Sequence, residues 1–128
     1  MPRVKEVKLE SEYDAHGLRV RIDRHAGYVA QGTAQDGSEY RTVYEVDYGY
    51  VPGVPGDDGD PYDVFVGLDG DFADAHVVEQ RNLDTGDYEQ QKLMWGFKDA
   101  AEAERVFRAH RAPEHFGRMG ALPRAEFL

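Results

Sequence analysis

An acidic cluster in the middle of the chain is the stretch with the clearest potential for chemistry. Four carboxylates fall within seven residues, at Asp57, Asp58, Asp60 and Asp63. Like charges this close repel one another, so such a cluster either faces bulk water or binds a cation. Glycine adopts positive φ angles and proline fixes its own φ, so Gly59 and Pro61 give the loop a defined shape. These features favour a cation-binding loop.

The residue types in this loop suit magnesium. Magnesium takes oxygen ligands, usually one or two carboxylates together with waters and substrate phosphates. A solvated acidic turn and a calcium-binding loop are the alternatives. The calcium loop fits poorly, because an EF-hand needs glycine at its sixth position and glutamate at its twelfth. Counted from Asp58, Gly59 is second and Asp69 is twelfth.

Two linked motifs carry a resemblance to a known family. The first, Asp58-Gly59-Asp60-Pro61-Tyr62-Asp63-Val64, is similar to the Asp-Gly-Asp-Pro-apolar-Asp-Val signature of the soluble, metal-dependent family I inorganic pyrophosphatases. The second, Asp47-Tyr48-Gly49-Tyr50-Val51, resembles that family's Asn-Tyr-Gly-Tyr-Ile segment. The short pyrophosphatase-like domains of phage and mobile-element proteins are more similar still, because they share the later run Lys92-Leu93-Met94-Trp95-Gly96-Phe97. The likeness extends from about Leu18 onward, and it favours a metal site over a passive turn.

The resemblance implies a role for each acidic residue. Asp58 and Asp63 would be metal ligands, and Asp60 would bind metal and orient or deprotonate the attacking water. Tyr48 would form a hydrogen bond near that water. A second pair of acids, Asp84 and Glu89, has the family's spacing of five with a one-residue shift, and would bind further magnesium ions, two or more in all. For Asp84, an ordinary turn residue is an equal alternative.

Substrate phosphates also require cationic side chains, and the resemblance implies three of them. Lys92, Arg41 and Arg111 would bind the substrate, with Arg118 as a competitor of Arg111. Arginine suits phosphate because its planar fork binds two oxygens at once. Solvated surface charge is the alternative for Arg111 and Arg118.

The function that the resemblance implies is magnesium-dependent hydrolysis of inorganic pyrophosphate to two phosphates by a metal-activated water. Two departures from the family pattern keep alternatives open. Gln90 stands where the phage-type pattern has an acid, and residues 27–31 lack the lysine and glutamate that ordinary members carry on an early strand. One alternative is a catalytically degenerate, pyrophosphatase-like module that binds metal or phosphate. The other is a hydrolase of another small phosphoanhydride.

Composition sets outer bounds on these functions. The chain has 128 residues, no cysteine and a formal net charge of -10 at pH 7. This length predicts a single inorganic-pyrophosphatase-like domain over residues 1–128, and the lack of cysteine excludes disulfides and thiolate metal sites. No apolar run approaches the roughly 18 residues that span a bilayer, and the negative charge repels nucleic acid and anionic membranes. We expect a cytoplasmic protein, or one in the host cytoplasm if phage-encoded, that acts on pyrophosphate; homo-oligomer formation is left open.

Short strands must position these residues. Apolar residues predict a weak amino-terminal strand at Val4, Val7 and Leu9. Strict alternation over residues 18–22 predicts a half-buried strand, and residues 64–66 form another strand directly after the acidic loop. Hairpins are predicted around Asp36-Gly37, joining residues 32–35 to 39–46, and around residues 84–87, joining 75–81 to 88–95.

One helix is predicted late in the chain. Asp99 and Glu102 form a capping box, and Ala103, Val106, Phe107 and His110 follow at helical spacing. The helix ends before Pro113. The tail, residues 116–128, forms a short closing helix or strand. The fold class is therefore mainly β (α+β), a small OB-like five-stranded barrel with one helix in the C-terminal half, and the resemblance implies the same barrel.

The histidines and most aromatic residues are predicted to have structural roles and no part in catalysis. The five histidines show no zinc spacing and are predicted to be surface or structural groups. Aromatic residues at positions 40, 44, 50, 65, 95 and 97 are predicted to pack in the core. A base-stacking platform is the alternative, and it is disfavoured because no basic residues lie among them in the sequence.

Overall fold

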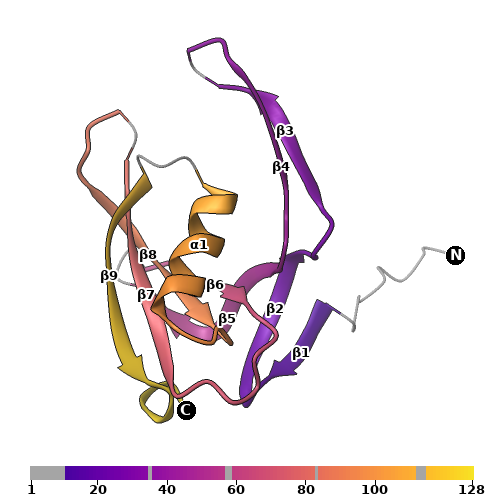
Figure 1. Cartoon of the computed structure of the whole chain (residues 1–128), viewed down its shortest axis with the longest axis vertical. Coiled ribbons are helices and arrows are strands. Elements are labelled where there is room, and N and C mark those ends of the chain that lie inside the picture. The colour runs from indigo at the N-terminus through magenta and orange to yellow at the C-terminus, as the bar shows by residue number, and fades with distance from the viewer. Residues whose placement is uncertain (1–10, 35, 57–58, 83, 112–114) are drawn as a thin grey trace, which may run out of the picture.

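The computed structural model describes residues 11–34, 36–56, 59–82, 84–111 and 115–128. Within these ranges the chain forms nine strands, one α-helix and a terminal 3-10 turn (Figure 1). The elements are β1 Glu12–Ala15, β2 Leu18–Arg24, β3 Val29–Thr33, β4 Glu39–Val43, β5 Asp47–Pro55, β6 Pro61–Val66, β7 Asp74–Arg81, β8 Tyr88–Trp95, α1 Ala100–His110, β9 Phe116–Pro123 and η3 Arg124–Phe127. None of the helices in this part of the chain is long and apolar enough to cross a membrane.

Seven of the strands form one sheet in the order β1-β2-β5-β6-β8-β7-β9. Neighbours are antiparallel except for β6 and β8, which are parallel. The remaining strands, β3 and β4, pair only with each other in the described part of the chain and form a separate hairpin that projects from the sheet (Figure 1).

The mainly β class with a late helix is confirmed, whereas the expected five-stranded barrel is not seen among the described residues. The sheet has seven strands, and its edges, β1 and β9, each have one partner strand. The physical reason is that β3 and β4 satisfy each other's backbone groups in a hairpin of their own. They are therefore not used to bridge the two edges of the large sheet.

Each face of the large sheet carries its own core, because successive side chains of a strand point to opposite faces. On one face, Val64, Leu93 and Trp95 are buried with the apolar side of β2. On the other face, Phe65 and Met94 pack with the buried side of α1. The functional question is therefore which face holds the chemistry-bearing residues.

The locally encoded elements agree with prediction. In β2, Leu18, Val20 and Ile22 are buried while the residues between them are exposed. The two hairpins form as predicted, β3 with β4 and β7 with β8. The Asp99 side chain accepts a hydrogen bond from the Glu102 amide at 2.9 Å, which caps α1 at its amino end.

The buried face of α1 consists of the four residues that the spacing picked out, Ala103, Val106, Phe107 and His110. The helix ends at His110, and the tail supplies both a strand, β9, and the η3 turn. The predicted amino-terminal strand lies outside the described residues, as does Pro113. Of the aromatic residues assigned to the core, Tyr44, Phe65, Trp95 and Phe97 are buried. Tyr50 is only half-buried, and Tyr40 is 50% exposed on the β3–β4 hairpin.

Candidate functional site

Three neighbouring strands bring Tyr48, Asp63 and Lys92 together on the helix side of the sheet. Lys92 of β8 lies directly opposite Asp63 of β6 in the parallel register. Its Nζ is 2.5 Å from Asp63 Oδ2 and 2.7 Å from the hydroxyl of Tyr48, which lies on β5. The predicted catalytic tyrosine, one predicted metal ligand and the predicted substrate lysine therefore form one hydrogen-bonded group.

Lys92 is buried, with 2% of its surface exposed. A buried ammonium is costly unless it is paired and hydrogen-bonded, and Asp63 and Tyr48 meet both needs. Burial raises the pKa of the Tyr48 hydroxyl, and the positive charge of Lys92 opposes that rise without cancelling it. Tyr48 therefore stays protonated at neutral pH, so its oxygen accepts from Lys92 while its own proton can be donated to another group.

Arg111 reaches the same group from the end of α1. It is the residue that follows the helix, in extended backbone conformation. Its guanidinium lies 5.0 Å from the centre of the Tyr48 ring and 5.2 Å from that of Phe65. Nη1 donates to the hydroxyl of Tyr44 at 3.0 Å. The predicted substrate-binding arginine is thus next to Tyr48.

Arg24 is a third cationic residue at this site, and sequence reasoning missed it. Its Nη1 donates to the Tyr44 hydroxyl at 2.6 Å, so this hydroxyl accepts hydrogen bonds from two arginines. Strict alternation would place Arg24 on the same face of β2 as buried Ile22. The register between β2 and β5 shifts between these two residues, and Arg24 is paired with Tyr48. A β-bulge re-aims side chains in this way, and no feature of the sequence signals it.

The acidic loop between β5 and β6 is only partly described. Gly59 has a φ of 87°, as the loop prediction requires. The amide of Gly56 donates to the Asp60 carbonyl at 2.6 Å, which closes the turn. Asp60 is exposed. Asp57 and the predicted ligand Asp58 lie outside the described residues.

The oxygen-only donors of this loop fit the ligand preference of magnesium. Across the described ranges, however, no three carboxylate or histidine side chains converge on one point. Asp63 can hold Lys92 with Oδ2 and a cation with Oδ1 at the same time, because a carboxylate has two acceptor oxygens. The chemistry of the donor set therefore fits the metal, and the roles of Asp58, Asp60 and Asp63 as ligands stay predictions.

The second predicted pair of acids lies on and before β8. Asp84 is exposed in the turn that joins β7 to β8, where its amide donates to the side chain of Asn82 at 2.8 Å. Glu89 stands at a register shift between β7 and β8, and its Oε1 lies 3.4 Å from Gln80 Nε2. Neither belongs to a three-acid group within the described ranges. Their metal roles remain predictions.

The other two predicted cations, Arg41 and Arg118, lie on β4 and β9. Arg41 lies on β4, opposite Gln31, and is exposed on the β3–β4 hairpin. Arg118 donates to Glu79 Oε2 at 2.8 Å. Of the two competing candidates, Arg111 and Arg118, only Arg111 lies beside the Tyr48 group.

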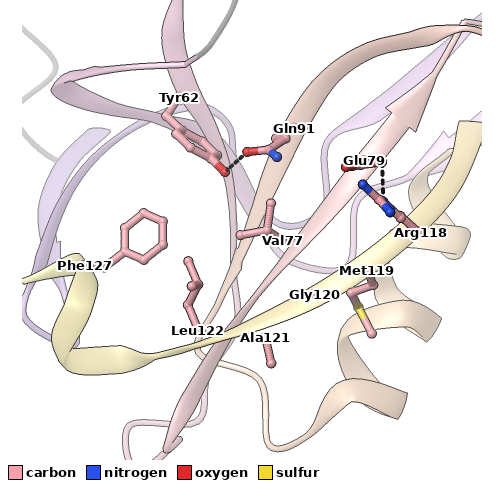
Figure 2. Close-up of a pocket in the computed structure, with 10 residues that line it drawn as sticks. All are labelled: Tyr62, Val77, Glu79, Gln91, Arg118, Met119, Gly120, Ala121, Leu122 and Phe127. Atoms are coloured by element: carbon pink, nitrogen blue, oxygen red, sulfur yellow. Dashed lines mark hydrogen bonds and ion pairs between the residues drawn. The ribbon is translucent and has the colours of Figure 1, made fainter.

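A cavity of about 570 Å³ lies on the other face of the sheet (Figure 2). Its lining includes Tyr62 and Gln91, which are hydrogen-bonded at 2.9 Å, together with Arg118 and Phe127. Tyr62 and Gln91 directly neighbour Asp63 and Lys92 in the chain, so their side chains point to the opposite face. This cavity is therefore separate from the Tyr48 group.

Comparison with known proteins identifies the family. No curated protein and no solved structure was found to match the chain. The model of the family described as Inorganic Pyrophosphatase matches residues 5–127, which is nearly the whole sequence. This match agrees with the motifs around Tyr48 and Asp63 that the strands bring together. The chain belongs to the inorganic pyrophosphatase family.

Proposed function

We propose that this protein hydrolyses inorganic pyrophosphate to two phosphates with magnesium. The observation that carries the proposal is the convergence of Tyr48, Asp63, Lys92 and Arg111, which come from three strands and the end of α1. A phosphoanhydride hydrolase needs a carboxylate for cation binding, a protonated hydroxyl and cationic groups, and these four residues supply them. The family match supports the same conclusion.

Lys92 and Arg111 bind the phosphoryl oxygens and neutralise the charge that shifts onto them as the anhydride bond breaks. Tyr48 donates its proton in a hydrogen bond to the attacking water and orients it, while Lys92 holds the Tyr48 oxygen in place. Asp60 accepts the proton of that water as its oxygen bonds to phosphorus. The bridging oxygen leaves with the second phosphate.

Asp58, Asp60 and Asp63 would hold magnesium in this proposal, with Asp84 and Glu89 as candidates for further ions. Bound magnesium would neutralise substrate charge and lower the pKa of a coordinated water. A net charge of -10 otherwise repels pyrophosphate. The acidic loop thus explains how so acidic a protein binds a polyanion.

A second candidate function is a binding module without turnover. Gln90 is the specific feature that favours it, because an amide stands where the phage-type pattern has a metal-binding acid. Magnesium binding without phosphate release would identify this module.

The test is phosphate release from pyrophosphate with and without magnesium, for the wild type and for Asp58→Asn and Asp60→Asn. Asp74→Asn is the matched control, since Asp74 is an exposed carboxylate at the start of β7. We expect magnesium-dependent release that both loop variants reduce by at least about 100-fold and that the control leaves unchanged. A folded wild type that binds magnesium and releases no phosphate would refute hydrolysis.

A further inference from the structure

The cavity on the face of the sheet opposite the Tyr48 group has no role in the proposed function. Its volume of about 570 Å³ falls in the range of small-molecule binding sites, about 300–1,000 Å³. Apolar Phe127 and Leu122 lie toward one end of the cavity, and Glu79 and Arg118 lie at the other (Figure 2). A ligand that fills this space therefore needs an apolar body and a polar edge.

The cavity has room for a ligand because one of its lining residues has no side chain. Gly120 of β9 lies directly opposite Val77 of β7, and both residues line the cavity. A Cβ added at Gly120 would meet no atom within 4 Å. Open space therefore lies over Gly120, and a larger side chain at this position would occupy it.

Aromatic rings form part of the apolar end. The ring centres of Tyr62 and Phe127 are 6.0 Å apart, and the two rings are inclined at 80°. Phe127 also packs against the buried ring of Trp95, at 5.9 Å between centres. Aromatic side chains bind flat ring systems by stacking. A planar ring is therefore the apolar body that suits this end of the cavity.

Gln91 supplies a hydrogen-bond donor for the polar edge. Its Oε1 accepts from the hydroxyl of Tyr62 at 2.9 Å, which fixes the orientation of the amide. Among the described residues, its Nε2 donates to no group. Gln91 on β8 lies directly opposite Glu79 on β7. The Cβ atoms of such a pair are about 4.5–5.5 Å apart, so both side chains can contact one small molecule.

Glu79 supplies the acceptors beside this donor. Arg118 Nε donates to Glu79 Oε2 at 2.8 Å, and Arg81 Nη2 lies 3.9 Å from the same oxygen. These two arginines hold the carboxylate in place. In the described part of the chain no group donates to the other oxygen, Oε1. A carboxylate has about four acceptor positions, so Glu79 can accept two further hydrogen bonds.

An amide donor next to a carboxylate matches the edge of one nucleobase. The Watson–Crick edge of guanine carries the acceptor O6 followed by two donors, N1–H and N2–H. Gln91 would donate to O6, and Glu79 would accept from both donors. Adenine, cytosine and uracil do not carry two neighbouring donor atoms on this edge. We propose that this cavity binds the guanine base of a nucleoside or nucleotide.

The test measures binding to the full chain by titration calorimetry with guanosine, guanosine monophosphate, inosine and adenosine. Inosine is guanosine without the N2 amino group, so it isolates one contact with Glu79. The variants are Gly120→Leu, Gly120→Ala and Glu79→Gln. Glu104→Gln is the matched control, because Glu104 also pairs with an arginine, Arg108 at 2.9 Å, but lies on α1. Thermal denaturation shows whether each variant is folded.

We expect guanosine to bind at least about tenfold more tightly than inosine or adenosine, as loss of a hydrogen bond to a charged group predicts. Glu79→Gln should weaken guanosine binding by about tenfold or more and inosine binding by less. Gly120→Ala should weaken binding and Gly120→Leu should abolish it, because the added side chain occupies the cavity. Glu104→Gln should leave binding unchanged. Tighter binding of the monophosphate assigns the cavity to nucleotides, tighter binding of guanosine assigns it to nucleosides, and both support the inference.

Equal affinities for guanosine, inosine and adenosine would overturn the inference, as would the absence of binding by all four compounds. A folded Gly120→Leu variant that binds guanosine like the wild type would also overturn it. The comparison of the four compounds uses the wild type alone, so it decides the question even if Gly120→Leu fails to fold. Neither result depends on whether the protein hydrolyses pyrophosphate.

Discussion

Lys92 and Asp63 face each other across two parallel strands, and their side chains form an ion pair in which the lysine is almost completely buried. Removing one partner of such a pair leaves an uncompensated charge in the interior. The pair therefore links the stability of the sheet to the chemistry of the site.

Replacing Asp63 by alanine should destabilise the protein by roughly 2–4 kcal/mol, because the Lys92 ammonium loses its carboxylate partner inside the protein. Chemical denaturation measures the change. Asp74→Ala is the control, and it should alter the free energy of unfolding by less than about 0.5 kcal/mol because Asp74 is exposed. An equally small effect at Asp63 would show that Tyr48 and water alone can satisfy Lys92.

Tyr48→Phe should lower kcat by about 10- to 100-fold while KM changes little, because it removes the hydrogen bond that we propose Tyr48 makes to the attacking water. Steady-state kinetics with pyrophosphate measures both. Tyr62→Phe is the matched control, since it removes a hydroxyl from the opposite face of the sheet. Since burial raises the pKa of Tyr48, ionisation of this hydroxyl should not limit activity below about pH 10. A Tyr48→Phe variant with wild-type kcat would contradict the role.

His110 should make stability fall in mildly acidic solution. Its Nδ1 contacts the Val106 carbonyl at 2.6 Å, and its Nε2 accepts from the Glu45 amide at 2.9 Å, which requires the neutral ring. Burial lowers the pKa of His110 from 6.5. Below about pH 6.5 the unfolded chain therefore binds more protons than the folded protein. The contribution of His110 to the free energy of unfolding is full above that pH, and it declines as the pH falls toward the lower pKa of His110 in the folded protein.

The measurement compares free energies of unfolding at about pH 7.5 and about pH 5 for the wild type and His110→Gln. The variant should be less stable at the higher pH and should lose less stability on acidification. His25→Gln is the control, because His25 is exposed. Identical pH dependence in the wild type and His110→Gln would remove His110 as the cause.

Gly49→Ala should destabilise the protein by more than about 3 kcal/mol or prevent folding. A Cβ at this position would lie 1.8 Å from the Arg21 carbonyl oxygen of the neighbouring strand β2. The clash is with backbone, so a side-chain movement cannot relieve it. Gly120→Ala on β9 is the control, since no atom lies within 4 Å of its added Cβ. Thermal denaturation compares the two, and similar midpoints would refute the argument.

Features set by neighbours in the chain were predictable. The alternation in β2 and the cap at Asp99 follow from period and residue type alone, and both are confirmed. The closure of the sheet was not predictable in this way, because it depends on which strands far apart in the sequence pair with each other. The same holds for the pairing of β3 with β4 instead of with a sheet edge.

In the candidate site, too, the identities of several residues were predictable from the sequence, whereas their arrangement in space was not. Motifs picked out Tyr48, Asp63 and Lys92 one by one, but only the sheet register shows that they share a hydrogen-bonded group. Arg24 was missed because one register shift reverses the direction of its side chain. Arg41 was favoured by its position in the sequence. It lies exposed on the β3–β4 hairpin, and its role in substrate binding stays a prediction.

The parallel pairing of β6 with β8 has a consequence for how the molecule folds. After β6 the chain forms β7, which does not pair with β6. The chain then turns back, and β8 lies between β6 and β7 in the sheet. The β7–β8 hairpin can form from local contacts, whereas its docking on β6 requires closure of a longer loop, which is slower. We therefore expect the proposed hydrolysis of pyrophosphate to return only with the slowest refolding phase, after the hairpin has formed. Stopped-flow refolding with a coupled phosphate assay would measure that delay.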